Sequence, residues 1–279
     1  MVEMGGRKDI EINLPLIRHM IINSIRSYKQ KFGGKYGDIV IACDNRHYWR
    51  RRVFPNYKAN RKKDREASGY DWTAIFEALS AVRDELDKFF PYPVVNVEGA
   101  EADDIIATLA EWSQSNDLSL GMFDEPKPLL VVSGDHDFIQ LQKYSNIKQY
   151  SPIQKKLVTP ERSPESYVIE HIIRGDSGDG VPNVLSDDNC LVESRRQKPI
   201  QTKKLEEWIK DPSTLPQDDE FKKNYDRNRV LVDLSCIPMS VKEAIINNFV
   251  SQPKKDRSQL MNYFMQHRMK MMLEVISEF

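Results

Sequence analysis

The chain has 279 residues, 40% of them hydrophobic and 9% aromatic, and its 41 basic residues nearly balance 42 acidic ones. This composition supports a well-filled core and excludes disordered, collagen-like and low-complexity classes. No stretch reaches the roughly 18 apolar residues of a membrane span, and residues 1–9 lack the apolar run of a secretory signal. Three widely spaced cysteines support neither a disulfide framework nor a zinc knuckle. We therefore expect a soluble, cytoplasmic protein without a membrane partner.

Strands and helices alternate along the first half of the sequence. Apolar residues at helical spacing predict helices over three stretches: residues 13–33, 72–86 and 105–112. Short continuous apolar runs predict buried parallel strands at residues 38–43, 94–97 and 129–133. We expect an α/β domain over residues 1–150, with a mostly parallel central sheet flanked by helices.

The pattern changes after residue 150. Short helical segments separated by proline- and glycine-containing turns follow, as in residues 163–176. They predict a helical C-terminal subdomain over residues 151–279.

Acidic residues follow each predicted strand. They are Asp44 after the first, Glu101, Asp103 and Asp104 after the second, and Asp135 with Asp137 after the third. Because the carboxyl ends of parallel strands share one edge of a sheet, we expect these acids to converge on one cleft. Asp176 and Asp179 repeat the spacing of Glu101 and Asp104 in the second half.

So many carboxylates would repel one another unless cations bind between them. Mg²⁺ prefers oxygen ligands, and the lack of clustered Cys and His argues against zinc. Two ions about 3.5–4 Å apart activate a water and stabilise the leaving oxygen in phosphodiester cleavage. His136 lies between two acids and is expected to point away, and His19, His47, His171 and His267 show no ligand spacing.

Residues 45–65 form a strongly basic segment that holds nine Lys or Arg, a single acid and interleaved aromatic residues. The cations can hold phosphates, and the rings can stack on bases at roughly 1–3 kcal/mol per base. Each feature alone has a simpler interpretation, since a charge run is usually a solvated face and an acid after a strand is often a helix cap. The joint occurrence favours a function on nucleic acid.

The ordered motifs resemble the structure-specific 5′ nucleases, the family of flap endonucleases and 5′–3′ exonucleases. The matching motifs are Asp44, R-x6-YK-x2-R at 50–61, EADD at 101–104, GDxD at 134–137 and GDxxD at 175–179. The resemblance extends through nearly the whole chain. The sequence around these motifs is similar to the branch of the family found in T-even-type bacteriophages.

This resemblance implies a PIN-like 5′ nuclease fold and a metal-dependent nuclease that removes 5′ flaps and RNA primers, a ribonuclease H activity, during lagging-strand replication. It implies two Mg²⁺ ions, with Mn²⁺ as an alternative, held by Asp44, Glu101, Asp103, Asp135 and Asp137. Asp104, Asp176 and Asp179 would complete the acidic shell.

By the same resemblance, Lys58 and Arg61 would reach the scissile phosphate from a basic arch over residues 45–65. The residues expected to guide the single strand are Arg50, Arg51, Arg52, Tyr57, Lys62 and Lys63. Expected partners are DNA and RNA–DNA hybrids with 5′ ends, flaps or forks, and a single-strand-binding protein or sliding clamp. We expect a monomer in the host-cell cytoplasm.

One departure from the family lies at the front of the chain. The family begins with a central strand that ends in a metal-ligating Asp, and residues 1–12 here hold only Asp9, without an apolar strand before it. We expect that strand and that carboxylate to be missing, through an internal start, a natural fragment or a degenerate copy. Metal binding should then weaken.

Two other classes of protein stay open. A branched-DNA-binding protein would keep the basic segment without competent metals. A phosphatase fold would use Asp135 and Asp137 as a DxD nucleophile motif, but that motif normally starts the domain and leaves the basic segment unexplained.

Overall fold

The computed structural model describes residues 12–114 and 126–279. These residues form two compact units that interleave along the sequence: unit 1 takes residues 12–41, 62–94 and 253–279, and unit 2 takes residues 42–61 and 95–252 around the gap. The predicted domain division at residue 150 stays a prediction. In the described ranges no helix is long and apolar enough to cross a bilayer. The expectation about Asp9 and the first strand lies outside the described residues.

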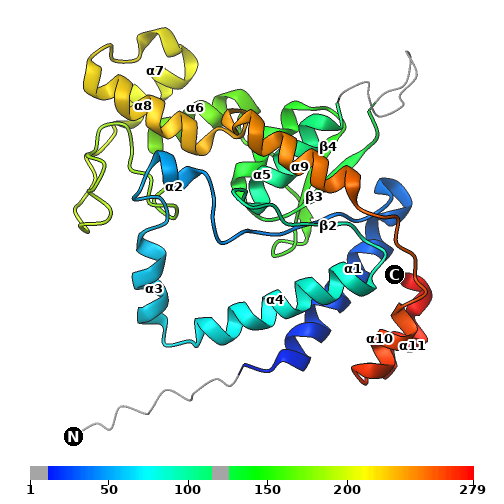
Figure 1. Ribbon diagram of the computed structural model, residues 1–279. Coiled ribbons are helices and arrows are strands. Elements are labelled where there is room, and N and C mark those ends of the chain that lie inside the picture. Colours follow the sequence, from blue (N-terminus) through cyan, green and yellow to red (C-terminus); the bar gives the residue numbers. More distant parts are fainter. Residues whose placement is uncertain (1–11, 115–125) are drawn as a thin grey trace, which may run out of the picture. The chain divides into compact units, whose positions relative to one another are not determined.

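Unit 1 is built on helices α1 (Leu14–Tyr36) and α4 (Trp72–Phe89), which lie against each other (Figure 1). Helix α1 begins where the Asn13 side chain accepts a hydrogen bond from Leu16 N at 2.9 Å. Helix α4 begins in the same way at Asp71. Such caps satisfy backbone N–H groups that the first helical turn leaves unpaired, so these polar residues fix where each helix starts.

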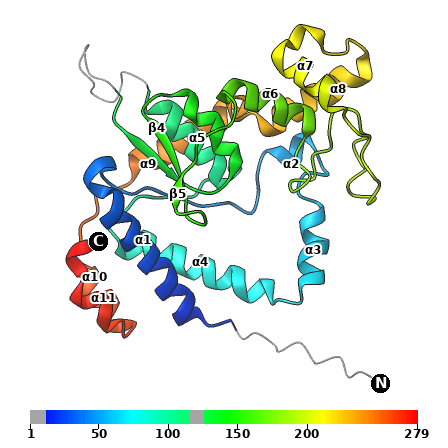
Figure 2. The ribbon, with the colours of Figure 1, turned by 180° about the vertical axis from the view of Figure 1, so that it is seen from behind.

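Residues near the C-terminus complete the core of unit 1. They form α10 (Leu260–Gln266), α11 (Lys270–Glu274) and the 3₁₀ turn η5 (Ile276–Glu278), shown in red in Figure 2. Aromatic rings from this segment pack on Phe90, which follows α4, in edge and tilted contacts. The buried rings are Phe90, Tyr263, Phe264 and Phe279. Unit 1 therefore depends on chain segments that are far apart in the sequence.

The strands form two small sheets. Strands β1 (Ile41–Ala42) and β2 (Val94–Val95) pair in one, and β3 (Leu129–Val132), β4 (Ile147–Ser151) and β5 (Lys156–Leu157) form the other. β3 and β4 are parallel, and β5 is antiparallel to β4. The α/β fold class with parallel strands is confirmed, although the strands are shorter than predicted and are divided between two sheets in the described residues.

Helices surround the strands of unit 2. Helix α5 (Ala102–Trp112) packs on α9 (Met239–Ser251), and α6 (Pro164–Arg174) packs on the 3₁₀ helix η2 (His136–Lys143) and on α8 (Asp219–Val232). The shorter helices are α2 (Arg50–Val53), α7 (Thr202–Lys210), η3 (Pro212–Thr214) and η4 (Leu234–Cys236), and α3 (Asn60–Ser68) spans the boundary between the units. The predicted helical second half is confirmed.

Candidate active site

The start of helix α5 gathers the acids that follow β2. Glu101 N donates to Asp104 Oδ2 at 2.9 Å, which is half of a capping box. Asp44, which follows β1, accepts a hydrogen bond from Ala102 N at 2.8 Å through its side chain. Two strand ends therefore meet at the N-terminus of one helix, where the helix dipole favours negative charge.

Asp104 is locked inside this arrangement. Its side chain is fully buried, Trp49 Nε1 donates to Oδ2 at 3.2 Å, and an Arg50 guanidinium nitrogen lies 2.8 Å from Oδ1. Oδ2 therefore accepts hydrogen bonds from Trp49 and from Glu101 N, and Oδ1 pairs with the Arg50 cation. The geometry gives Asp104 a role at the helix start, and its expected place in the acidic shell stays a prediction.

Arg50 was expected to guide a nucleic-acid strand, but it lies inside the protein. Only 3% of the residue is exposed, and its guanidinium donates to Leu231 O at 2.8 Å and to Glu101 Oε2 at 2.9 Å. Asp104 and Glu101 raise its pKa, although burial opposes them. The one-turn helix α2 turns this arginine inward, so Arg50 neutralises buried carboxylates.

Lys58 and Tyr57 sit between two acids that are distant in sequence. Lys58 is 8% exposed, pairs with Glu101, and its Nζ lies 3.4 Å from Asp179 Oδ2. The Tyr57 hydroxyl lies 2.8 Å from Asp179 Oδ2 and 3.1 Å from Glu101 Oε2. Burial lowers the pKa of Lys58, but the two carboxylates outweigh it and raise that pKa, so the side chain stays charged.

Arg61 extends this ion-pair network toward solvent. A guanidinium nitrogen lies 2.5 Å from Asp179 Oδ1, and 47% of the Arg61 side chain is exposed. The predicted catalytic cations Lys58 and Arg61 therefore share one carboxylate partner.

The loop that carries Asp179 packs tightly on the loop that carries Lys58. Gly180 has a φ of 75°, and a Cβ there would lie 2.9 Å from Asn56 O. Farther along, Asn228 is fully buried on α8 and donates to Pro182 O at 2.8 Å. Close backbone approach on one side and a buried amide on the other hold this loop in place.

Asp103 lies among other acids in unit 2. Burial, followed by the charges of Asp135 and Asp137, raises the pKa of Asp103 to about 7. Asp176 Oδ1 accepts from Gly178 N at 2.8 Å, which shapes the turn that follows α6. A half-buried carboxylate among like charges, with its protonated form favoured, is the setting in which a bound cation would restore ionisation.

One pocket joins these groups. It brings together carboxylates from α5, from η2 and from the loop after α6, with side chains from α2, α8 and η4. The lining residues are Arg50, Tyr57, Asp103, Asp137, Asp176, Asp179, Leu231, Val232 and Leu234.

His171 was not expected at this site. It lies on α6, with Nδ1 3.1 Å from Asp137 Oδ1 and Nε2 3.7 Å from Asp176 Oδ2. Burial lowers the pKa of His171, but the two carboxylates outweigh it and raise that pKa to about 10. The sequence signal was its position one helical turn before Gly175, which ends α6 ahead of the second acid pair. His136 is exposed, as expected.

The other predicted guides of the strand lie on exposed helix surfaces. Arg51 and Arg52 are exposed on α2 in unit 2, and Arg51 stacks over the Tyr48 ring at 5.1 Å. Lys62 and Lys63 are exposed on the unit 1 part of α3. Tyr57, at 3% exposure, is buried and contacts carboxylates, so its ring is not available for stacking on a base.

Family models match both halves of the chain. Residues 12–170 match the 5′–3′ exonuclease, N-terminal resolvase-like domain, and residues 162–279 match the C-terminal domain of T4 RNase H.

Individual relatives agree with these matches. The chain is 35% identical to ribonuclease H of Enterobacteria phage T4 over 96% of its own length and 88% of the relative's. It is 28% identical to a 5′–3′ exonuclease of Streptomyces coelicolor over 52% of this chain and 50% of that protein.

Solved structures show the same fold. A bacteriophage T5 protein co-crystallised with metal ions matches with a TM-score of 0.60 at 17% identity, covering 85% of this chain and 95% of that chain. A bacteriophage T5 flap endonuclease in complex with DNA and metal ions also has a TM-score of 0.60 at 17% identity, covering 84% and 90%. Because the first family model matches more than half of the chain and the phage T4 relative matches nearly all of it, the chain belongs to the 5′–3′ exonuclease family of nucleases.

Proposed function

We propose that this nuclease hydrolyses phosphodiester bonds near the 5′ ends and flaps of DNA and of RNA–DNA hybrids. The observation that carries the proposal is one pocket lined by Asp103, Asp137, Asp176 and Asp179. Lys58 carries a charged ammonium, and its Nζ lies 3.4 Å from Asp179 Oδ2. Carboxylates that bind divalent ions and a cation that binds phosphate are the two requirements of metal-assisted phosphoryl chemistry.

The donor set fits hard divalent cations. The acids offer oxygen ligands, and burial together with the charges of Asp135 and Asp137 raises the pKa of Asp103, an effect that a bound cation would offset. We propose two Mg²⁺ ions, with Mn²⁺ as an alternative, held by Asp44, Asp103, Asp135, Asp137 and Asp176, with Glu101 and Asp179 close by. When bound, such ions lower the pKa of a water and stabilise the leaving oxygen. Asp104 is left out because it is fully buried, with Oδ2 bound by two protein donors and Oδ1 paired with Arg50.

Lys58 and Arg61 act on the scissile phosphate in this proposal. Both contact Asp179, so each is already oriented toward the acidic pocket. A fixed ammonium and a half-exposed guanidinium stabilise the charge that builds up on phosphate oxygens during cleavage. Their contact with a carboxylate also keeps them in place when substrate is absent.

The basic arch holds the single strand. Exposed cations on α2 and α3 bind its phosphates: Arg51, Arg52, Lys62 and Lys63. Because each phosphate contact releases counterions, affinity for a flap should fall steeply as salt rises. The helical half grips the adjoining duplex, and the support for DNA binding is that a T5 flap endonuclease of the same fold has been crystallised with DNA.

The biological setting is proposed by analogy with the ribonuclease H of phage T4, to which the chain is similar. We propose removal of RNA primers and short 5′ flaps from lagging-strand fragments by a monomer in the host cytoplasm. A single-strand-binding protein or sliding clamp would be its partner there.

The test is Mg²⁺-dependent cleavage of a 5′-labelled flap and of an RNA–DNA hybrid, with binding titrated separately in Ca²⁺. Asp135→Asn should abolish cleavage and leave binding nearly intact, because it removes a metal ligand and leaves the phosphate contacts. Asp84→Asn, on the exposed face of α4, is the matched control and should cut normally.

Two results would contradict the proposal. Normal cleavage by Asp135→Asn would mean that the acids lie elsewhere. Tight, structure-selective binding without cleavage by the unaltered chain would identify a branched-DNA-binding protein.

A further inference from the structure

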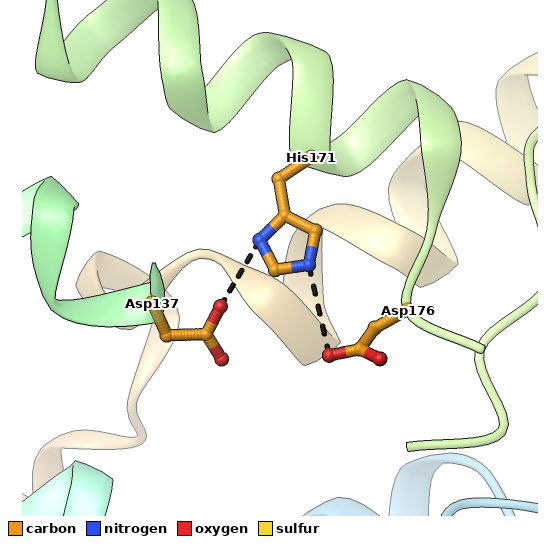
Figure 3. Close-up of side chains that lie close together, drawn as sticks. All are labelled: Asp137, His171 and Asp176. Atoms are coloured by element: carbon orange, nitrogen blue, oxygen red, sulfur yellow. Dashed lines mark ion pairs between the residues drawn. The ribbon is translucent and has the colours of Figure 1, made fainter. Parts of the chain in front are cut away.

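The imidazole of His171 lies between two carboxylates that approach it from different parts of unit 2. Asp137 stands at the start of η2 and Asp176 follows the end of α6, and Figure 3 shows one facing each ring nitrogen. Within the described residues, these three side chains form the group whose potential ligand atoms lie within 4.8 Å of one another. All three are partly buried.

The separations suit a single metal ion. Ligand atoms at ~2.1 Å from one ion lie about 3.0 Å apart in an octahedral arrangement and about 3.4 Å apart in a tetrahedral one. The Nδ1–Asp137 distance is 3.1 Å and the Nε2–Asp176 distance is 3.7 Å. Only small shifts would therefore bring either nitrogen and a carboxylate oxygen onto the same ion.

The ring is held in its orientation by its surroundings. The His171 side chain is 12% exposed, and the Tyr167 ring, one turn earlier on α6, meets it edge-on at 5.7 Å. Asp176 is fixed by the N–H groups of Gly178 and Asp179 at 2.8 and 3.1 Å. A rigid ligand loses little freedom when it binds an ion.

The second carboxylate also has a place in such a site. Metal-ligating histidines almost always donate their other ring N–H to a carboxylate or carbonyl, which fixes the tautomer. His171 has a carboxylate at each nitrogen, so either nitrogen can bind the ion while the other donates.

We propose that His171 Nδ1 and Asp137 are direct ligands of one divalent ion, with Asp176 held at Nε2, and that this site prefers Mn²⁺ or Co²⁺ to Mg²⁺. The inference rests on the proposed function, because it assigns the composition of one of its metal sites. Imidazole suits transition metals, whereas Mg²⁺ is best served by carboxylate and water oxygens. A mixed nitrogen and oxygen site therefore shifts the metal preference of an otherwise acidic pocket.

Pulsed EPR of Mn²⁺ bound to the full chain tests the ligand directly, without relying on cleavage. We expect a nitrogen-14 coupling typical of coordinated imidazole, and its replacement by a nitrogen-15 coupling when the protein is labelled at histidine. The labelling experiment uses the unaltered sequence, so it does not depend on how a variant folds.

His171→Gln identifies which histidine is bound. It should remove the nitrogen coupling and lower Mn²⁺ affinity by about 10-fold to 100-fold, with a smaller loss for Mg²⁺ in parallel calorimetric titrations. His136→Gln is the matched control, since His136 is exposed and adjacent to Asp135 and Asp137, and it should keep both the coupling and the affinity ratio.

The inference is overturned if the unaltered chain shows no imidazole coupling, or if the coupling persists in His171→Gln. His171 would then be a cationic bridge between two carboxylates. Cleavage that requires Asp135 would still support the proposed function in that case. An imidazole-coupled ion without cleavage would reject the proposed function and leave the metal site standing.

Discussion

Lys58 and Asp179 are joined twice, once through the backbone and once through side chains. Lys58 N donates to Asp179 O at 2.7 Å, and Lys58 Nζ lies 3.4 Å from Asp179 Oδ2. Lys58 also adopts a φ of 57°, in the left-handed region that is uncommon for a residue with a side chain. The double contact fixes this unusual backbone conformation and places the ammonium at the acidic pocket.

Lys58→Ala should slow the chemical step about 10²-fold to 10³-fold and affect DNA affinity much less, because the ammonium acts near the transferring phosphate. Single-turnover cleavage in Mg²⁺ and binding in Ca²⁺ separate the two effects. Lys62→Ala, on the exposed face of α3, should weaken binding and keep the single-turnover rate at saturation. A loss confined to binding in Lys58→Ala would make this lysine a tether only.

Arg50 and Arg51 are neighbours with opposite expected effects. Arg50→Ala should lower the free energy of unfolding by roughly 3–5 kcal/mol, because it leaves buried Asp104 without its cation and removes one of the two cations that pair with Glu101. Arg51→Ala should change stability by less than about 0.5 kcal/mol, weaken flap binding and flatten the salt dependence. Urea unfolding and salt-dependent binding of both variants measure these quantities, and equal stability of the two would show that Arg50 is not needed to neutralise the buried carboxylates.

Asp103 should make the metal-free protein less stable as pH rises. Its pKa is raised from 3.8 to about 7 in the folded state, so the folded protein binds the proton more tightly than the unfolded chain. This contribution is complete below about pH 4 and is lost as pH rises through 7, by at most about 4 kcal/mol. Unfolding in EDTA across this window should show the loss.

Two variants supply the comparison. Asp103→Asn should remove this part of the pH dependence, and the control Asp84→Asn should behave like the unaltered chain. The range below pH 6.5 is the decisive one, since the pKa of His171 is raised from 6.5 to about 10 and affects stability only above that range. Identical pH profiles for Asp103→Asn and the unaltered chain would contradict the assignment.

Gly180→Ala should disrupt the contact between the two loops of the site. A Cβ there would meet Asn56 O at 2.9 Å from a residue with a φ of 75°, so both sterics and backbone conformation oppose it. We expect lower stability and slower cleavage. Gly34→Ala is the matched control, because its Cβ would enter open space in helix α1 and should stabilise by about 0.5–1 kcal/mol. Unchanged cleavage by Gly180→Ala would show that the loops tolerate separation.

The sequence predicted the parts of the fold that local rules determine. Apolar spacing predicted the helices that became α1 and α4, and in the structure Asn13 and Asp71 cap them because a short polar side chain can satisfy the first unpaired N–H groups. Asp44 and Glu101 meet because parallel strands end at the same edge. The lengths of the strands depend on pairing with distant segments, which no local pattern reveals.

The residues whose positions the sequence did not predict depend on how helices are oriented and packed in three dimensions. Arg50 is the first of three consecutive arginines. The orientation of α2 buries it and leaves Arg51 exposed. His171 meets Asp137 through the packing of α6 on η2, which sequence spacing does not encode. Asp104 matched a metal motif and a helix cap equally well, and its burial beside Trp49 favours the helix cap.

The interleaving of the two units also affects how the chain matures during synthesis. All segments of unit 2 have been translated once residue 252 leaves the ribosome, whereas unit 1 still awaits residues 253–279, which bring Tyr263 and Phe264 to its aromatic cluster. Chains fold as their segments emerge, so the nuclease pocket can assemble before the other core closes. No single cut in the polypeptide yields both units whole, and an expression strategy for either one would need a rearranged gene.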